Sequence, residues 1–596
     1  MSNICDFCGA VNDDKATKCV YCYNPLTPVT NATAPQENDP TQSNNASRTS
    51  ATAPLLDGND GGSDTPIICG SDTSIICGSD TPIISANDNG YIVENIFCDD
   101  DWAEKLEDIS DDSNEFGLIL TDTSKLKDKT AFYDALSSYI ESRRVDDEVE
   151  YVLLDIATQN ISKCNTKDVE SVLQLLYEVY ECVVPNYLMI VGDSTVIPSM
   201  EWANESRDDD KTVVSDLPYM TFDIDSPWSG KEFNFNDVTQ VGRIPAIPEN
   251  GFKEAIAYFN CVKNRKSYDN ATAWAYSAYE WVHTSKTEFT PVSATLLTSP
   301  NYTTDSRLTS TKGIVMLDKI NPKFNLLCFN LHGTDSNHKW YGQYEDFYPE
   351  AFNAKFLPTS SSYFLCCEAC YGAKPNVSKS GEQSIVVTAL SNNCLAFVGS
   401  SRIAYGMGDG TLACADVVVG TFAEQVSKGD TCGLAFTKGL AKQCKGRMRE
   451  SEIKTIAEFA LYGDPSVKLI GSSTKKRSNK PSINKPRQNN SFAFSLFACN
   501  SEASAFESRQ GRLTLYSCSA QDMQKYKTMS LSINKMGNAF MAKNFSATSN
   551  GEPRIYKLAG KSGYRAVYSS NKGEINKTVI LHLDDNGKIE NVYVSK

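Results

Sequence analysis

The chain has 596 residues, 41% of them hydrophobic, and a formal net charge of −17. This length predicts three or four domains with a sizeable buried core. The acidic excess argues against nucleic acid or an anionic membrane surface as a bulk electrostatic partner.

Targeting features and cysteine usage favour a cytoplasmic protein. No apolar run approaches the roughly 18–20 residues of a membrane helix, so we expect no membrane association. The N-terminus shows neither the basic region nor the apolar core of a secretory signal. The 20 cysteines lie largely within apolar runs or at metal-like spacing, which favours a reducing compartment over a secreted disulfide framework.

Residues 1–27 hold two Cys-x2-Cys pairs, Cys5 with Cys8 and Cys19 with Cys22. Four thiolates at this spacing can bind Zn²⁺ tetrahedrally, and the metal supplies folding energy that so short a segment cannot obtain from a core. We predict a structural zinc ribbon that docks a protein partner. The alternative is a tail with four unpaired cysteines.

Two segments without a core follow the ribbon. Residues 28–98 are rich in Asn, Thr, Ser, Pro and Gly and contain three copies of an eight-residue unit, which predicts a disordered linker. Residues 99–115 are acidic. We interpret this acidic segment either as a solvated face or as a regulatory pro-segment.

Residues 116–470 alternate short apolar runs with amphipathic stretches, which predicts an α/β domain with a mainly parallel sheet flanked by helices. The predicted strands are 116–121, 151–155, 187–193, 326–330, 363–367 and 394–399. The predicted helices are 129–142, 168–181, 384–390, 412–426 and 453–461.

The C-terminal part differs in character from the α/β region. Residues 471–490 form a basic, proline-containing linker. Residues 491–596 show the alternation of half-buried strands, which predicts a small β-rich domain. Its expected strands are 512–516, 529–533, 564–568, 579–583 and 592–594, with a hairpin turn at 584–587.

His332 and Cys370 each follow a buried-looking strand, at 326–330 and 363–367. Open α/β sheets place their active sites at the carboxyl ends of strands. A thiol beside an imidazole is a nucleophile with its base. The pair therefore predicts a cysteine peptidase.

The α/β region resembles the gingipain-type (C25) cysteine peptidases, which have a caspase-like fold. Seven short motifs stand in that family's order, and together they are hard to obtain by chance. They are 191–198 (VGDSTVIP), 215–219 (SDLPY), 241–245 (VGRIP), 332–333 (HG), 369–370 (AC), 398–401 (VGSS) and 462–465 (YGDP).

The resemblance implies roles for particular residues. His332 and Cys370 correspond to the catalytic dyad, and the backbone N–H groups of Gly333 and Cys370 are expected to bind the oxyanion. Asp216 corresponds to the acidic residue that holds a basic P1 side chain in arginine-specific gingipains; the alternative is a structural role in a helix cap or loop. Further residues that correspond to the wall of this pocket are Ser400, Ser401 and Tyr405.

The resulting hypothesis is an intracellular, regulated endopeptidase that cleaves after Arg or Lys. The acidic segment 99–115 would hold it inactive, or processing at the basic linker would mature it. Gingipains also bind calcium, but no acidic loop of this chain is specific enough to assign as its ligands. The alternative from another class is a catalytically silent caspase-like scaffold that binds partners through its zinc ribbon.

Overall fold

The computed structural model describes part of the chain and divides it into two units, Met1–Gly78 and Ser79–Lys596. The described residues are 3–4, 11–12, 83–86, 92–230, 232–300, 323–376, 383–444, 446, 448–471, 506–509, 512–515, 529–530, 532–541, 553–557, 563–572 and 575–596.

In the first unit, β1 (Asn3–Ile4) pairs antiparallel with β2 (Val11–Asn12). All four predicted zinc ligands, Cys5, Cys8, Cys19 and Cys22, lie outside the described residues. The zinc ribbon therefore stays a prediction. Within the predicted linker 28–98, β3 (Ile83–Ala86) pairs antiparallel with β4 (Ile92–Glu94), and Ile96 and Phe97 are buried, so its last part is folded; residues 28–82 lie outside the described residues.

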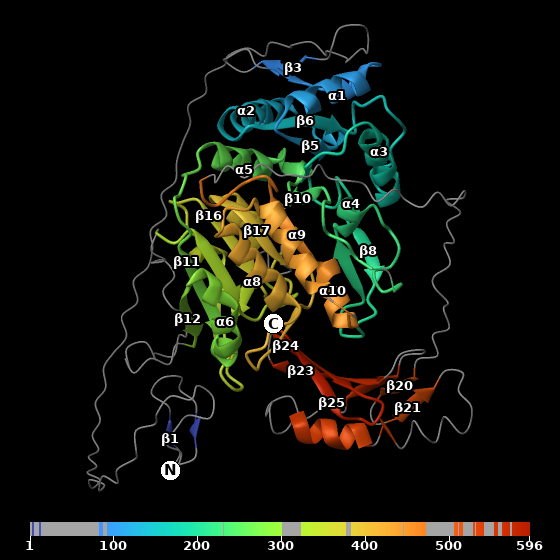
Figure 1. The fold of residues 1–596 in the computed structure, drawn as a ribbon, viewed down its shortest axis with the longest axis vertical. Coiled ribbons are helices and arrows are strands. Elements are labelled where there is room, and N and C mark those ends of the chain that lie inside the picture. Colours follow the sequence, from blue (N-terminus) through green and yellow to red (C-terminus); the bar gives the residue numbers. More distant parts are fainter. Residues whose placement is uncertain are drawn as a thin grey trace, which may run out of the picture. The chain divides into compact units, whose positions relative to one another are not determined.

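The second unit is built on a ten-stranded sheet (Figure 1). Its strands, in spatial order, are β12 (Thr295–Ser299), β11 (Ala273–Ala278), β13 (Leu326–Asn330), β16 (Tyr363–Cys367), β17 (Cys394–Ser400), β19 (Phe459–Gly463), β10 (Gln240–Ile244), β7 (Tyr187–Val191), β5 (Glu115–Thr121) and β6 (Val149–Asp155). Most of these strands are apolar and buried on both faces, as expected for a parallel sheet covered by helices. The predicted mainly parallel sheet is confirmed.

Two parallel halves make up this sheet. The five strands from β12 to β17 run parallel to one another, and so do the five from β19 to β6. The halves meet where β17 pairs antiparallel with β19. Strands of different halves therefore present their carboxyl ends at opposite edges of the sheet.

Helices flank the sheet, with α8 and α9 in front of it in Figure 1. The main ones are α2 (Thr130–Asp147), α3 (Val169–Cys182), α5 (Lys253–Lys263), α6 (Val282–Phe289), α7 (Ile385–Leu390), α8 (Ala415–Val426), α9 (Cys432–Gln443) and α10 (Glu450–Glu458). Each helix buries an apolar face; on α8, Phe422 stacks on Phe364 of β16. Among the described residues, no helix is long and apolar enough to span a membrane.

A second, seven-stranded sheet is formed almost entirely by the C-terminal part of the chain. Its order is β18 (Tyr405–Gly406), β25 (Ile589–Ser595), β24 (Ile575–Leu583), β23 (Tyr564–Lys572), β22 (Arg554–Lys557), β20 (Phe506–Arg509) and β21 (Arg512–Leu515). All its pairings are antiparallel. We call the part formed by residues 506–596 the C-terminal module. Its edge strand β18 belongs to the peptidase-like region, so the two regions share a sheet.

Two sequence predictions are corrected here. The helix predicted at 453–461 ends at Glu458, and β19 begins at the next residue, because Phe459 and Leu461 are buried in the central sheet. The strand predicted at 529–533 is helical at 529–530, and residues 532–541 form a helix. Ile533 and Met541 lie eight residues apart and are both buried, a spacing that suits one face of a helix.

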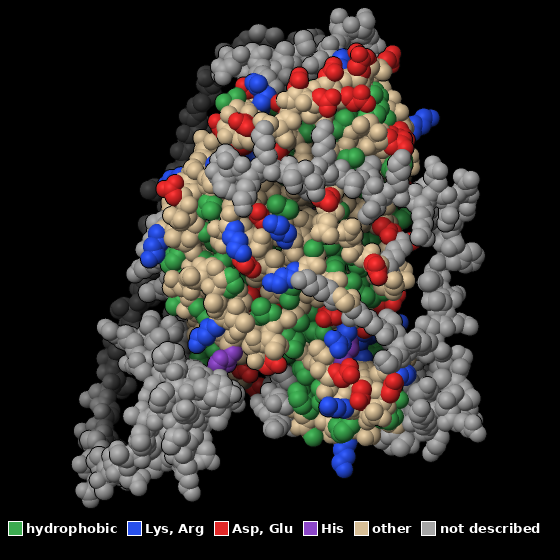
Figure 2. Space-filling model, viewed as in Figure 1, with side chains coloured by type: hydrophobic (Ala, Val, Ile, Leu, Met, Phe, Trp, Pro, Cys, Tyr) green, Lys and Arg blue, Asp and Glu red, His purple; other side chains and the backbone are tan. Residues whose placement is uncertain are grey.

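The acidic segment forms a helix, α1 (Trp102–Asp112), that buries Leu106. Its acidic side chains are mostly exposed, and Figure 2 shows acidic side chains gathered over this part of the molecule. Lys105 pairs with Asp99 and Asp101 at the start of the helix. The segment thus presents a solvated acidic face.

Candidate active site

The register of two neighbouring strands brings His332 and Cys370 together. β13 and β16 are parallel, and Phe329 pairs with Cys367. His332 and Cys370 each follow these paired residues by three positions. Both therefore emerge at the same edge of the same half of the sheet, as the sequence predicted.

His332 is buried and held from several sides. Its backbone exchanges two hydrogen bonds with Tyr341, and its ring packs against Trp281, with ring centroids 4.2 Å apart. Its Nε2 atom lies 2.7 Å from Oε1 of Gln343. Since Nε2 of Gln343 donates to the carbonyl of Glu345, Oε1 is left facing the imidazole as an acceptor. His332 Nε2 therefore carries the proton, which leaves on Nδ1 the lone pair that a base needs.

Cys370 is also buried, with its Sγ 3.6 Å from the carbonyl oxygen of Ala404. Burial raises the pKa of the Cys370 thiol well above its usual range. Burial, followed by the charge of Lys577, lowers the pKa of His332 to about 3. Both groups are thus neutral in this state of the site.

A carbonyl oxygen already occupies the position expected for an oxyanion. The backbone N–H groups of Cys370 and Gly333 donate to the carbonyl oxygen of Lys596, at 3.1 and 3.4 Å. A Cβ atom on residue 333 would lie 2.9 Å from the carbonyl carbon of Cys370 and closer still to its oxygen. Only glycine permits this approach. The two N–H groups that the sequence suggested as oxyanion donors thus both donate to one oxygen atom.

The residues before Lys596 run along β18 as an added strand. Ser595 pairs with Tyr405 and Val594 with Gly406, both antiparallel. The backbone N–H of Lys596 donates to the carbonyl of Ala404 at 3.0 Å. Peptides commonly bind a receptor in this way, with main-chain hydrogen bonds to an exposed strand edge.

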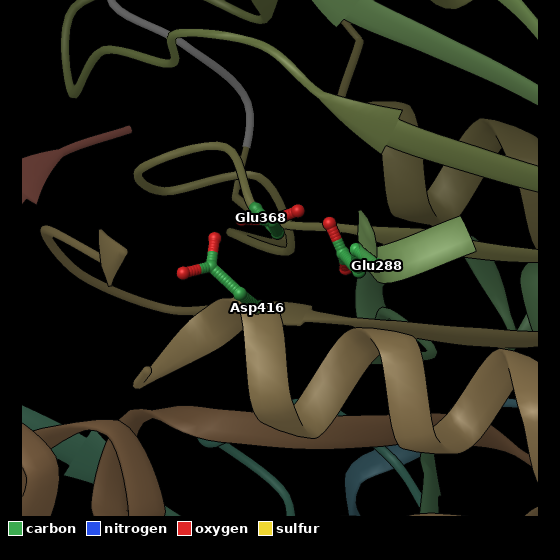
Figure 3. Close-up of side chains that lie close together, drawn as sticks. All are labelled: Glu288, Glu368 and Asp416. Atoms are coloured by element: carbon green, nitrogen blue, oxygen red, sulfur yellow. The ribbon is translucent and has the colours of Figure 1, made fainter. Parts of the chain in front are cut away.

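The Lys596 side chain enters a fully buried acidic pocket. The carboxyl groups of Glu288, Glu368 and Asp416 converge there, with one oxygen of each lying within 4.8 Å of the others (Figure 3). The Nζ atom of Lys596 lies 3.1 Å from Asp416 and 3.5 Å from Glu368. It also donates to the carbonyl of Met407 at 3.2 Å.

Other parts of the pocket fit the lysine as closely. Nζ stands 4.4 Å from the ring centroid of Trp281, within cation–π range. A Cβ atom on Gly406 would meet Cε of Lys596, which shows that the lysine stem passes directly over this glycine. The Trp281 ring thus lies against both the lysine and His332.

The charges of the pocket favour a cation. Burial, together with Glu368 and Asp416, raises the pKa of Glu288 well above its usual range, and burial also raises that of Glu368. Burial alone would lower the pKa of Lys596, but the three carboxyl groups outweigh it and raise this pKa. Within the described residues, both carboxyl oxygens of Glu288 and of Glu368 lack a hydrogen-bond donor. Such buried acceptors are costly unless a cation or proton compensates them.

The structure places Asp216 elsewhere. Its two oxygens bind the guanidinium of Arg243 in a bidentate pair, at 2.6 and 2.7 Å, and Ser199 donates to it as well. Arg243 in turn donates to the carbonyls of Gly192 and Ile197. Asp216 therefore ties β10 to the loop after β7, in line with the structural alternative.

The other residues of the expected pocket wall make mainly structural contacts. Ser400 Oγ accepts from the N–H of Arg402, and Ser401 Oγ donates to the carbonyl of Val214. The hydroxyl of Tyr405 donates to Asp208 at 2.8 Å, while its backbone belongs to β18. Of these three, only Tyr405 lines the added strand.

Sequence reasoning missed the acidic pocket, Gln343 and Lys596. Glu288, Glu368 and Asp416 belong to α6, the loop after β16 and α8, and each is buried. The available signal was a carboxylate within an otherwise apolar stretch, which is rare unless the charge is paired. Nothing in the sequence near Lys596 indicated that its side chain would lie in this pocket.

A model of peptidase family C25 matches residues 117–470. No curated protein matches the chain in sequence. A solved structure described as "Structure of Protease" is 13% identical with a TM-score of 0.41, covering 79% of this chain and 98% of its own.

Two structures of the Saccharomyces cerevisiae separase–securin complex also show similarity. Each is 12% identical with a TM-score of 0.26 and covers 50% of this chain and 17% of its own. The family match spans more than half of the sequence and contains both members of the Cys-His pair. The chain belongs to peptidase family C25, a family of cysteine peptidases.

Proposed function

We propose that the protein is a cysteine endopeptidase that cleaves peptide bonds after lysine, with Cys370 as nucleophile and His332 as base. One observation carries this proposal: the backbone of Lys596 is bound as a substrate residue would be. Its carbonyl oxygen lies on two N–H donors beside Cys370, and its side chain fills an acidic pocket.

The chemistry follows from these positions. As the Cys370 thiol gives its proton to His332, the sulfur attacks the carbonyl carbon and the C=O electrons move onto the oxygen. The N–H groups of Gly333 and Cys370 stabilise this oxyanion. The imidazolium then protonates the leaving amine, and an acyl-enzyme remains. Water, deprotonated by His332, hydrolyses the thioester, and the proton returns to sulfur as the acid leaves.

The preference for lysine rests on the shape and charge of the pocket. A compact ammonium has three donors, and Asp416, Glu368 and the Met407 carbonyl surround Nζ. Lys596 has no exposed surface, and its stem passes directly over Gly406. A guanidinium is larger and planar, so we expect cleavage after arginine to be weaker.

The sequence carries bonds that such an enzyme could cut in itself. The basic linker contains Lys475, Lys476 and Lys480. Cleavage there would separate the peptidase domain from the C-terminal module, consistent with a regulated, self-processed intracellular enzyme. Intact mass measurement of the wild type and of Cys370→Ala tests this step, since only the wild type should be cut after these lysines.

The activity is tested with a fluorogenic peptide library varied at P1. We expect cleavage after lysine, reduced by about 10³-fold or more in Cys370→Ala and His332→Ala. Compared in a Lys596→Ala background, Glu368→Gln and Asp416→Asn should lower kcat/KM for lysine by at least about tenfold, since each weakens a charge-assisted contact with the substrate ammonium. Glu249→Gln, on an exposed turn, is the control.

Three results would contradict the proposal in part or in whole. Cleavage that persists in Cys370→Ala would show that Cys370 is not the nucleophile. A P1 preference that is unchanged in both pocket variants would show that the acidic pocket does not select lysine, and would leave the peptidase assignment in place. Absence of turnover in the wild type and in variants with an emptied site would favour the catalytically silent scaffold.

A further inference from the structure

The segment Ile589–Lys596 occupies the candidate active site through three kinds of contact. Its backbone pairs with β18, the Lys596 carbonyl accepts from Gly333 and Cys370, and its ammonium lies in the acidic pocket. Each contact uses a different chemical property, and all three converge on one residue. A strand that merely packed against a neighbouring domain would need only the first.

The ammonium is the part that packing does not explain. Surface positions are open to lysine almost everywhere, whereas a fully buried lysine is rare because its charge must be desolvated. The opposite edge of β25 already pairs with β24, so the module gains no sheet contact from the Lys596 side chain. The complementary carboxyl groups account for its burial.

The C-terminal module is held against the peptidase region by contacts away from this pocket. Arg565 donates to the carbonyl of Ser206 at 2.8 Å and pairs with Glu450 on α10. Arg554 pairs with Asp209 at 2.9 Å. These ion pairs hold the part of the C-terminal module from which the segment extends into the site.

The same arrangement shields the dyad. Cys370 and His332 have exposed fractions of 2% and 1%. Lys577 of β24 also contributes its charge near His332, which disfavours the imidazolium. An imidazole that resists protonation is poorly suited to deliver a proton to a leaving amine.

We propose that residues 589–596 are a tethered, substrate-like inhibitor that blocks the peptidase until the segment leaves the site. This inference rests on the proposed function, because it assigns that same site its regulation. A segment joined to the enzyme faces the site at an effective concentration on the order of millimolar, so external peptides compete poorly. Partner binding to the module, or cleavage of the linker before it, would release the block.

The test changes the Lys596 side chain and keeps the rest of the strand. Lys596→Ala empties the pocket, and Lys596→Glu places a negative charge among the three carboxyl groups. Residues 589–595 keep their pairing with β24 in both variants. Lys588→Ala is the matched control, because Lys588 lies just before the same strand and is exposed. Melting temperatures report whether each full-length protein is folded.

Two readouts separate docking from catalysis. Alkylation of Cys370 by iodoacetamide, followed by mass spectrometry, measures access to the thiol. Turnover of a small P1-lysine peptide measures the peptidase. We expect both rates to rise at least about tenfold in Lys596→Ala and Lys596→Glu, as a tethered competitor is lost, and neither to change in Lys588→Ala.

The four outcomes lead to different conclusions. Faster alkylation with faster turnover supports the inhibitor and the peptidase together. Faster alkylation without turnover in any protein keeps the docked segment and overturns the peptidase. Unchanged alkylation with measurable, unchanged turnover overturns the inhibitor and keeps the peptidase. Unchanged alkylation without turnover overturns both.

Discussion

The backbone nitrogen of Cys370 donates a hydrogen bond to the carbonyl oxygen of Lys596 at 3.1 Å. The residue that carries the proposed nucleophile thus also binds the carbonyl next to it. In acyl transfer this donor strengthens as negative charge develops on the oxygen. The contact places the backbone oxygen of the chain's own lysine on the N–H group that we propose as an oxyanion donor.

The ionisation of His332 should report whether the site is occupied. Burial and the neighbouring cations lower its pKa to about 3, so the imidazole stays neutral from pH 8 to pH 5 in the occupied site. In Lys596→Ala we expect its pKa to rise towards the usual value of about 6.5. Titration by NMR measures this, with His332→Asn assigning the resonance among four histidines.

Release of the segment should itself depend on pH. His332 has the higher pKa in the released site, so it takes up a proton there under conditions in which it stays neutral in the occupied site. Acid between about pH 6.5 and pH 3 should therefore favour release of the segment. Alkylation of Cys370 that, after correction for thiolate content, slows across this window would contradict the assignment.

Gln343 should act as a positioning residue for His332. Gln343→Ala removes the acceptor that fixes the Nε2–H tautomer. We expect kcat to fall at least about tenfold, part of the 10²–10⁴ that a positioned base contributes. Gln343→Glu keeps the acceptor and adds a negative charge, which raises the pKa of His332 and should move the acid limb of the pH–rate profile to higher pH. If the acid limb of the pH–rate profile does not move in Gln343→Glu, Gln343 does not position His332.

Gly406 should control entry to the lysine pocket. Gly406→Ala places a methyl group on the path of the lysine stem. In a Lys596→Ala background, where release of the segment cannot mask the effect, cleavage after lysine should fall by at least about tenfold in kcat/KM as the fit is lost. Gly408→Ala is the control, because its Cβ would have only one neighbour, at 4.0 Å. Steady-state kinetics of the two variants, with melting temperatures, make the comparison. Equal losses in both would point to a general loop effect.

Asp216 and Asp416 should have separable roles. Asp216→Asn leaves the charge of buried Arg243 uncompensated and should lower the free energy of unfolding by about 3 kcal/mol. Its P1 preference should stay the same. Asp416→Asn, compared in a Lys596→Ala background, should instead weaken cleavage after lysine. Denaturant unfolding together with the P1 profile checks both, and a changed P1 preference in Asp216→Asn would restore its assignment to the pocket.

A peptide appended after Lys596 should be removed by the enzyme itself. Because the Lys596 carbonyl already rests on the two N–H donors, the following bond would lie at Cys370. We expect intact mass spectrometry to show loss of the appended peptide in the wild type, and its retention in Cys370→Ala and in Lys596→Ala. Removal that persists in Cys370→Ala would identify a contaminating protease.

The sequence by itself determined most of the local elements and was enough to propose the Cys-His pair. Short apolar runs in the sequence indicate buried strands, and residues 326–330 and 363–367 form strands with the expected bounds. His332 and Cys370 could be paired because parallel neighbours end at a common edge. Where two elements meet without a turn residue, as at Glu458 and Phe459, the pattern could not separate helix from strand.

Only the tertiary structure decided what surrounds the dyad. Glu288, Glu368, Asp416 and Lys596 come from four separate segments, and no spacing rule links them. The sequence resemblance placed Asp216 in the substrate pocket, but in the structure its carboxylate binds the buried Arg243 of β10. Charges attract whichever partner the fold brings within a few ångströms, and that distance depends on how sheets, helices and module pack. The sequence therefore supplied the reactive groups, and the packing chose their partners.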